Sequence, residues 1–280
     1  MHAQENLDQE ITNLKLELGE LLKEQDIDPQ EAKVFLEKLR ILLNKGQLRA
    51  ANQVNGQWQP VLWVVEALQL FFKLGTRYHY NNNYTSFFDL DTLPLKKLSW
   101  DDLIRVVPGG SSIRDGCHIG KGTVLMPPVF INIGVYIGEK CMIDSHVLVG
   151  SCAQIGDGVH IGTGSHIGGI IDPVGTMPVV VEDSVRIGGN CGIFGSVVIQ
   201  SSVVIAAGTI ITDHTPVYDL VRQSVYIRSE QEQLVIPSGA LVVPGARSYA
   251  ALGVDSVISL HTPVIVKYYS NTLKSSLWTR

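Results

Sequence analysis

An aliphatic residue stands at every sixth position through the centre of the chain. One unbroken series runs from Ile113 to Ile167, and a second, shifted in phase by two residues, runs from Val181 to Ile211. A small or β-branched residue stands two positions before each member of both series. This period is typical of a parallel β-helix, in which each hexad forms a short strand and a turn with its aliphatic residue facing inward.

Three such hexads close one triangular coil, and the coils stack through their strand edges. The sixteen hexads of the two series predict about five coils, a prism on the order of 25 Å long at a strand spacing of roughly 4.8 Å. We therefore predict a mainly β protein. It consists of an α-helical N-terminal domain (1–107), a left-handed parallel β-helix (108–245) and a small C-terminal cap (246–280).

The flanking segments carry other patterns. Leucine and isoleucine recur at three- and four-residue steps in 5–24, which predicts an amphipathic helix. Asp28 and Pro29 form an N-cap and first-turn pair for a second helix that ends near Gly46. Asn55-Gly56 predicts a hairpin within 48–59, and a third helix is expected over 61–74. Three asparagines at 81–83 predict a loop.

The hexads lapse twice. The gap between Gly168 and Val179 contains Asp172, Pro173, Gly175 and Pro178, so a loop must leave the prism there, and such loops commonly build ligand sites. The second gap covers 212–234, after which hexads return briefly around Ile236 and Val242. A strand-like segment at 264–266 would cap the last coil, whose backbone groups would otherwise be unpaired.

Glycine follows the inward aliphatic residue in seven hexads, where we expect it to supply turn angles that cost other residues a Cβ clash. Asp144 occupies this position after Ile143. A short carboxylate tolerates such a turn, so Asp144 is either a plain turn residue or a residue kept for its chemistry.

Charge and hydropathy exclude several classes of protein. A net charge of −5 without a long basic run argues against nucleic acid as the main partner. The longest apolar stretch, 61–74, is interrupted by Glu66, Gln69 and Lys73 and is too short to span a membrane. The polar, acidic opening does not fit a signal peptide, so we expect a cytoplasmic protein.

The four cysteines do not form a metal or disulfide motif. Cys117, Cys141 and Cys191 fall at the small inward position of a hexad, where they fill the core. Cys152 has no CxxC partner. We expect neither a metal nor a required disulfide.

From about Gly46 to Lys267 the chain resembles the bacterial tetrahydrodipicolinate N-succinyltransferases. The resemblance rests on motifs that hexapeptide repeats do not share in general, among them Gly56-Gln57-Trp58, Arg105-Val106-Val107-Pro108, Val124-Leu125-Met126-Pro127, Val149-Gly150-Ser151-Cys152-Ala153-Gln154-Ile155-Gly156, Val181-Glu182-Asp183 and Val264-Ile265-Val266-Lys267. It implies transfer of a succinyl group from succinyl-CoA to the acyclic amino form of tetrahydrodipicolinate in lysine and diaminopimelate biosynthesis. It also implies a homotrimer with sites between neighbouring prisms.

The resemblance assigns roles to particular residues. The substrate-binding arginine of the family falls on Arg105, whose planar guanidinium suits a dicarboxylate. Its aspartate falls on Asp144, which would hold the acceptor ammonium and accept or relay the proton lost when the amine attacks the thioester. The pantetheine arm of the acyl-CoA would lie along late coils, near Gly188, Ala206, Ala207 and Gly208.

The sequence also departs from the family pattern. Two glutamates of the second hexad series correspond to Gly192 and Gly195, and the basic residue before them corresponds to Asn190. A tryptophan two residues beyond the aspartate is replaced by His146, whose imidazole titrates near working pH and is the candidate to compensate as a catalytic group.

Three other histidines support an alternative interpretation, in which His146 is a tolerated surface residue. They stand just before an inward aliphatic residue, where side chains point outward, so histidine is tolerated on this prism; they are His118, His160 and His166.

Three functions are compatible with the sequence. The first is succinyl-CoA:tetrahydrodipicolinate N-succinyltransferase. The second is a related N-acyltransferase that uses succinyl-CoA or another acyl-CoA on a different amino diacid, as in a tabtoxin-like pathway. The third is a non-catalytic trimeric binding protein.

Overall fold

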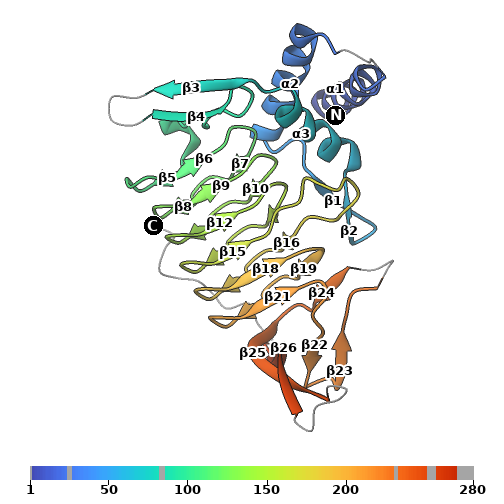
Figure 1. The fold of residues 1–280 in the computed structure, drawn as a ribbon, viewed down its shortest axis with the longest axis vertical. Coiled ribbons are helices and arrows are strands. Elements are labelled where there is room, and N and C mark those ends of the chain that lie inside the picture. The colour runs from blue at the N-terminus through green and yellow to red at the C-terminus, as the bar shows by residue number, and fades with distance from the viewer. Residues whose placement is uncertain (1, 24–26, 82–85, 230–232, 251–256, 270–280) are drawn as a thin grey trace.

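The computed structural model describes residues 2–23, 27–81, 86–229, 233–250 and 257–269. Figure 1 shows a column of stacked β-coils with helices at one end and a long hairpin at the other. The helices are α1 (His2–Leu21), α2 (Pro29–Asn44) and α3 (Leu62–Lys73), and a short 3-10 turn, η1 (Trp100–Asp102), precedes the coils. The predicted combination of N-terminal helices with a mainly β hexapeptide repeat is confirmed.

Three sheets of parallel strands form the faces of the prism. The first face contains β7 (His118–Ile119), β10 (Tyr136–Ile137), β13 (Gln154–Ile155), β16 (Val180–Val181), β19 (Val197–Ile199) and β24 (Leu234–Ile236). The second contains β5 (Arg105–Val106), β8 (Val124–Leu125), β11 (Met142–Ile143), β14 (His160–Ile161), β17 (Arg186–Ile187) and β20 (Val204–Ile205). The third contains β6 (Ser112–Ile113), β9 (Phe130–Ile131), β12 (Leu148–Val149), β15 (His166–Ile167), β18 (Gly192–Phe194) and β21 (Ile210–Thr212).

The predicted aliphatic positions form the core of this prism. Every member of both hexad series is buried, with Ile113 the most exposed at 7%. The strands pair in register, so that Ile137 lies beside Ile155, and Ile155 beside Val181 across the phase break. Among the cysteines, burial raises the pKa of Cys117, Cys141 and Cys152 to about 12, because an apolar site disfavours the thiolate.

Our explanation of the glycines that follow the aliphatic residues was wrong. Gly120 and Gly188 do not adopt left-handed φ angles. A Cβ on Gly120 would instead lie 2.4 Å from the carbonyl carbon of Gly138 in the next coil, and one on Gly188 would lie 2.5 Å from the backbone nitrogen of Ala207. The glycines therefore allow close approach of successive coils. The left-handed residues come two positions later, as at His146 with φ +62°.

The N-terminal helices share a core that also covers part of the prism. Leu14, Phe35, Leu68 and Phe71 are buried in it, together with Ile133, a turn residue of the prism. Asp28 caps α2 as expected, since its side chain accepts a hydrogen bond from the Gln30 amide. The prism and the N-terminal region therefore pack as one continuous structure.

Two hairpins belong to this region. The predicted hairpin is β1 (Ala51–Val54) with β2 (Gln57–Pro60), which turns at Asn55-Gly56. A second, which we did not predict, pairs β3 (Arg77–Asn81) with β4 (Ser86–Leu90). Asn81, expected in a loop, ends β3, whereas Asn82 and Asn83 lie outside the described residues.

The C-terminal part extends the second face. β25 (Ala240–Ala250) pairs with β20, and β26 (Val257–Tyr268) returns antiparallel to it and contains the strand predicted at 264–266. The hairpin β22 (Val217–Asp219) with β23 (Ser224–Tyr226) fills the second gap in the hexads. β25 crosses the predicted boundary at 245, and the second face begins at β5, before residue 108.

Candidate functional site

The register of the second face aligns most of the predicted site residues along one edge of the prism. Arg105 is exposed on β5, which pairs with β8, and β8 in turn pairs with β11. Asp144 follows β11 directly, at the corner between the second and third faces. Two strand spacings, roughly 10 Å, therefore separate the Arg105 strand from the strand that leads to Asp144.

Asp144 has a partner that the sequence did not reveal. Its Oδ2 atom lies 2.9 Å from Nε2 of His160, an outward residue of β14 in the next coil. The two side chains are about one-third exposed, at 31% for Asp144 and 34% for His160. The sequence pattern alone places His160 among the tolerated surface histidines. One coil contains 18 residues, so Gly162 lies beside Asp144 in the next coil. His160 is the outward residue two positions before Gly162, and this spacing is the sequence signal that could have identified the contact.

His146 lies two residues beyond Asp144 in the same turn. Its left-handed backbone is fixed by a 2.7 Å hydrogen bond from its amide to the carbonyl of Pro128 in the preceding coil. The imidazole is exposed. In the part of the chain that the structure describes, no hydrogen bond to this side chain is found, in contrast to His160.

The residues expected near the acyl-CoA continue the corner of Asp144. The amide of Asp144 donates to Ile161, that of Gly162 to Ile187 and that of Gly188 to Ile205. Asp144, Gly188 and Ala206 thus occupy one column, with Ala206 three coils, or about 14 Å, beyond Asp144. Ala207 and Gly208 are exposed in the turn that follows. The structure aligns these residues but brings none of them into contact with Asp144.

Neighbouring side chains fill the space beside Gly192 and Gly195, the two positions at which the resemblance predicts glutamates. A Cβ on Gly192 would lie 2.5 Å from Cε2 of Phe194, so the phenyl ring occupies this space. A Cβ on Gly195 would lie 2.3 Å from Oδ1 of Asp213. Asp213 is buried, pairs with Arg228 and accepts a 3.1 Å hydrogen bond from the Ser196 amide.

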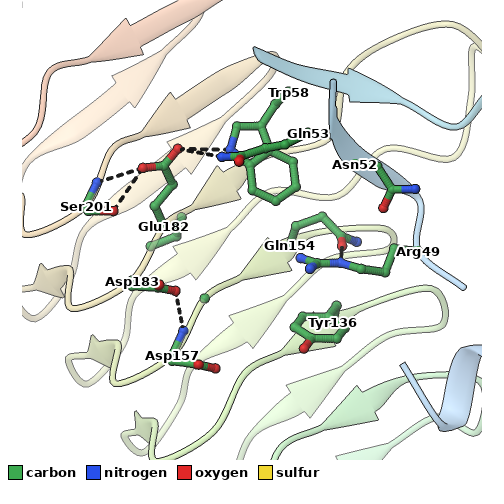
Figure 2. A pocket seen from close by; sticks show the side chains of 12 residues that line it. Arg49, Asn52, Gln53, Trp58, Tyr136, Gln154, Asp157, Glu182, Asp183 and Ser201 are labelled. Atoms are coloured by element: carbon green, nitrogen blue, oxygen red, sulfur yellow. Dashed lines mark hydrogen bonds between the residues drawn. The ribbon is translucent and has the colours of Figure 1, made fainter. Parts of the chain in front are cut away.

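A separate cleft of about 490 Å³ lies between the first face and the β1–β2 hairpin (Figure 2). It is lined by Arg49, Trp58, Tyr136, Gln154, Asp157, Glu182 and Asp183, among others. None of the predicted site residues lines it. The loop at the first phase break does not line it either. The Ile171 carbonyl of that loop accepts a 2.9 Å hydrogen bond from Gln69 of α3.

Comparison with known proteins agrees with the hexapeptide repeat. A family model described as bacterial transferase hexapeptide (six repeats) matches residues 134–169, and one described as hexapeptide repeat of succinyl-transferase matches 178–213. The 2,3,4,5-tetrahydropyridine-2,6-dicarboxylate N-succinyltransferase of Sodalis glossinidius is 35% identical over 231 residues, which cover 80% of this chain and 79% of the relative. The chain belongs to this family.

A second relative gives the same result. The corresponding enzyme of Acinetobacter baylyi is 32% identical over 246 residues, which cover 85% of each chain. A crystal structure of a Campylobacter jejuni protein described as a putative N-succinyltransferase of this type aligns over 82% of this chain and 62% of that one, with 14% identity and a TM-score of 0.36. As a member of this family, the chain is a hexapeptide acyltransferase.

The helices give no indication of a membrane span. Within the described ranges, none is both long and apolar enough to cross a bilayer.

Proposed function

We propose that this protein transfers the succinyl group of succinyl-CoA to the amino group of acyclic tetrahydrodipicolinate. The observation that carries the proposal is the Asp144–His160 hydrogen bond, at the aspartate position of a family named for this reaction. Similarity to the named relatives over four-fifths of the chain supports the substrate class.

In the proposed reaction the acceptor nitrogen attacks the thioester carbonyl carbon. A new C–N bond forms, the C–S bond breaks, and coenzyme A leaves as its thiol after taking up a proton. Asp144 first holds the ammonium of the acceptor and then accepts the proton that the nitrogen must lose. His160, which we propose donates from Nε2, orients the Asp144 carboxylate.

The remaining predicted residues surround this centre. Arg105, on the same edge, would bind a carboxylate of the amino diacid through two parallel hydrogen bonds. The acyl-CoA would lie along the corner column that contains Gly188, Ala206, Ala207 and Gly208. We further propose a cytoplasmic homotrimer, in which a neighbouring prism completes the open edge that carries Asp144.

One observation favours a second candidate, an N-acyltransferase for a different amino diacid. Glycine at 192 and 195 removes both glutamates that the family pattern places in the second hexad series, and Phe194 fills the space beside Gly192. An apolar ring in place of a carboxylate would change which acceptor fits. If no acceptor is acylated, the third reading, a non-catalytic trimeric binding protein, becomes the better one.

A coupled thiol-release assay tests the proposal. The purified protein is mixed with succinyl-CoA or acetyl-CoA and with tetrahydrodipicolinate or another amino diacid. We expect release with succinyl-CoA and tetrahydrodipicolinate. Release only with a different acceptor or acyl-CoA would favour the second candidate, and acyl-CoA or amine binding without release would favour the third.

A further inference from the structure

The cleft beside the first face is built from two separate parts of the chain. Arg49 precedes β1, whereas Tyr136 and Gln154 are outward residues of β10 and β13. Asp157 and Asp183 belong to the turns that follow β13 and β16. Figure 2 shows Arg49 and Tyr136 on one side of the cleft and the two aspartates on the other.

The Arg49 guanidinium is held rigidly without a counter-ion. Its Nε donates a 2.8 Å hydrogen bond to Oε1 of Gln154, whose buried amide also donates to the Cys152 carbonyl. Its Cζ lies 3.7 Å from the centroid of the Tyr136 ring. Among the described residues no carboxylate oxygen lies within 4.0 Å of it. Burial lowers the pKa of Arg49, because desolvation disfavours its charged form.

The opposite side of the cleft carries two carboxylates, and each uses only one oxygen in hydrogen bonds to described residues. Oδ1 of Asp157 accepts the Glu139 amide, and Oδ1 of Asp183 accepts the Asp157 amide, both at 2.8 Å. These bonds fix the two side chains one coil apart, roughly 4.8 Å. Both side chains are exposed, and neither has a cationic partner within 4.0 Å in the described ranges.

Glu182 closes the cleft and adds a third negative charge. Its Oε1 accepts a 2.9 Å hydrogen bond from the Trp58 indole, and its Oε2 accepts 3.0 Å bonds from the amide and hydroxyl of Ser201. The bond from Trp58, on β2, joins the β1–β2 hairpin to the prism. All three donors are neutral and leave the charge of the carboxylate uncompensated.

We propose that this cleft binds a basic α-amino acid, with its carboxylate on Arg49 and its two ammonium groups on Asp157 and Asp183. One guanidinium and two carboxylates that each keep an oxygen match a ligand with one negative and two positive charges, and Glu182 adds to the negative potential of the cleft. The planar guanidinium suits a carboxylate, and each aspartate keeps an oxygen for an ammonium. The site is independent of the proposed acylation, which takes place at the corner between the second and third faces.

Isothermal titration of the full-length protein with L-lysine, without acyl-CoA, tests the proposal. We expect saturable binding in the micromolar to millimolar range. Cadaverine lacks the carboxylate, and 6-aminohexanoate lacks the α-ammonium. The affinity of each should be lower than that of L-lysine by at least about tenfold, because each loses a charged hydrogen bond. L-glutamate, with the opposite net charge, should not compete.

Two variants and a matched control locate the ligand. Asp183→Asn keeps the acceptor for the Asp157 amide and removes only the charge, so it should weaken L-lysine binding about tenfold without unfolding the turn. Arg49→Met should do the same. Glu139→Gln, one rung earlier on the same corner and outside the cleft, should bind as the wild type does.

Several results would overturn the proposal. They are the absence of L-lysine binding, equal affinity for cadaverine, or unchanged affinity in both Asp183→Asn and Arg49→Met. Circular dichroism of each variant shows whether it is folded. Asp144→Asn separates this proposal from the proposed function, since it should lose acyl transfer and keep L-lysine binding.

Discussion

The carboxylate of Asp144 and the imidazole of His160 form a 2.9 Å hydrogen bond between successive coils of the β-helix. The partners are 16 residues apart because one belongs to a corner and the other to the outward side of the next strand. Neither residue has a side-chain hydrogen bond to any other described residue. The pair can therefore form a further hydrogen bond with a bound molecule, such as the acceptor amine.

Asp144→Asn should lower the rate of acyl transfer by about 10² to 10⁴, because the amide can neither hold the acceptor ammonium nor accept its proton. Single-turnover kinetics with succinyl-CoA would measure this loss. Oligomeric mass and affinity for coenzyme A are the controls and should change little. Wild-type activity in this variant would mean that the inherited site is not used.

Replacing the two nearby histidines separates their roles. If His160 orients Asp144, His160→Phe should lower kcat by about 10², the cost of a small misplacement, and His160→Gln should recover part of it through its own N–H donor. If His146 instead replaces the lost family glutamate, His146→Gln should cause the larger loss. The turnover rates of the three variants decide between them, and we expect the larger loss at His160.

His118 should make the protein less stable in acid. It stacks on Tyr136 with a centroid distance of 4.8 Å, and burial lowers its pKa below the ordinary value of 6.5. The unfolded chain therefore takes up a proton at higher pH than the folded chain. The stabilising contribution of neutral His118 is complete above pH 6.5 and is lost as the pH falls from there through the folded-state pKa.

Thermal unfolding across this range measures the effect. His118→Phe keeps a stacking ring without a titrating group, so its melting temperature should fall less steeply below pH 6.5 than that of the wild type. The control is His79→Gln on the β3–β4 hairpin, where the side chain is exposed, and its curve should follow the wild type. Parallel slopes for His118→Phe and wild type would contradict the prediction.

Ile155→Ala should lower the free energy of unfolding by about 2 to 5 kcal/mol, because it leaves a cavity in a closed, well-packed coil. The side chain is fully buried between Ile137 and Val181. Ile41→Ala removes the same atoms from an outward position of α2 that is 42% exposed, and should cost clearly less. Denaturant midpoints of the two variants make the comparison, and equal costs would argue against an inward Ile155.

The protein should be a homotrimer. The slim prism exposes Leu148, Phe194 and Ile210 on its third face, at 37%, 38% and 37%, and side-by-side packing of three copies would cover such side chains. Light scattering at micromolar concentration should give three times the monomer mass of 30.6 kDa. A monomer mass would contradict this prediction and the proposal of a site shared between subunits.

The sequence alone determined the fold, because the β-helix is a repeating local structure. Each hexad places its aliphatic residue inward independently of the others, so the period from Ile113 to Ile211 already identifies the core. The α2 cap at Asp28 and the turn at Asn55-Gly56 are also local, and both were predicted correctly. The family resemblance likewise came from contiguous motifs.

Contacts between coils were decided by the tertiary structure. The role of Gly120 was misassigned because its constraint comes from Gly138 in the next coil and not from its own backbone angles. His160 was overlooked because its partner, Asp144, becomes a neighbour only when the coils stack. The cleft at Arg49 depends on contacts of even longer range, since it forms where the β1–β2 hairpin packs on strands about 100 residues later in the chain. Such contacts depend on the register between distant segments, and local pattern does not specify that register.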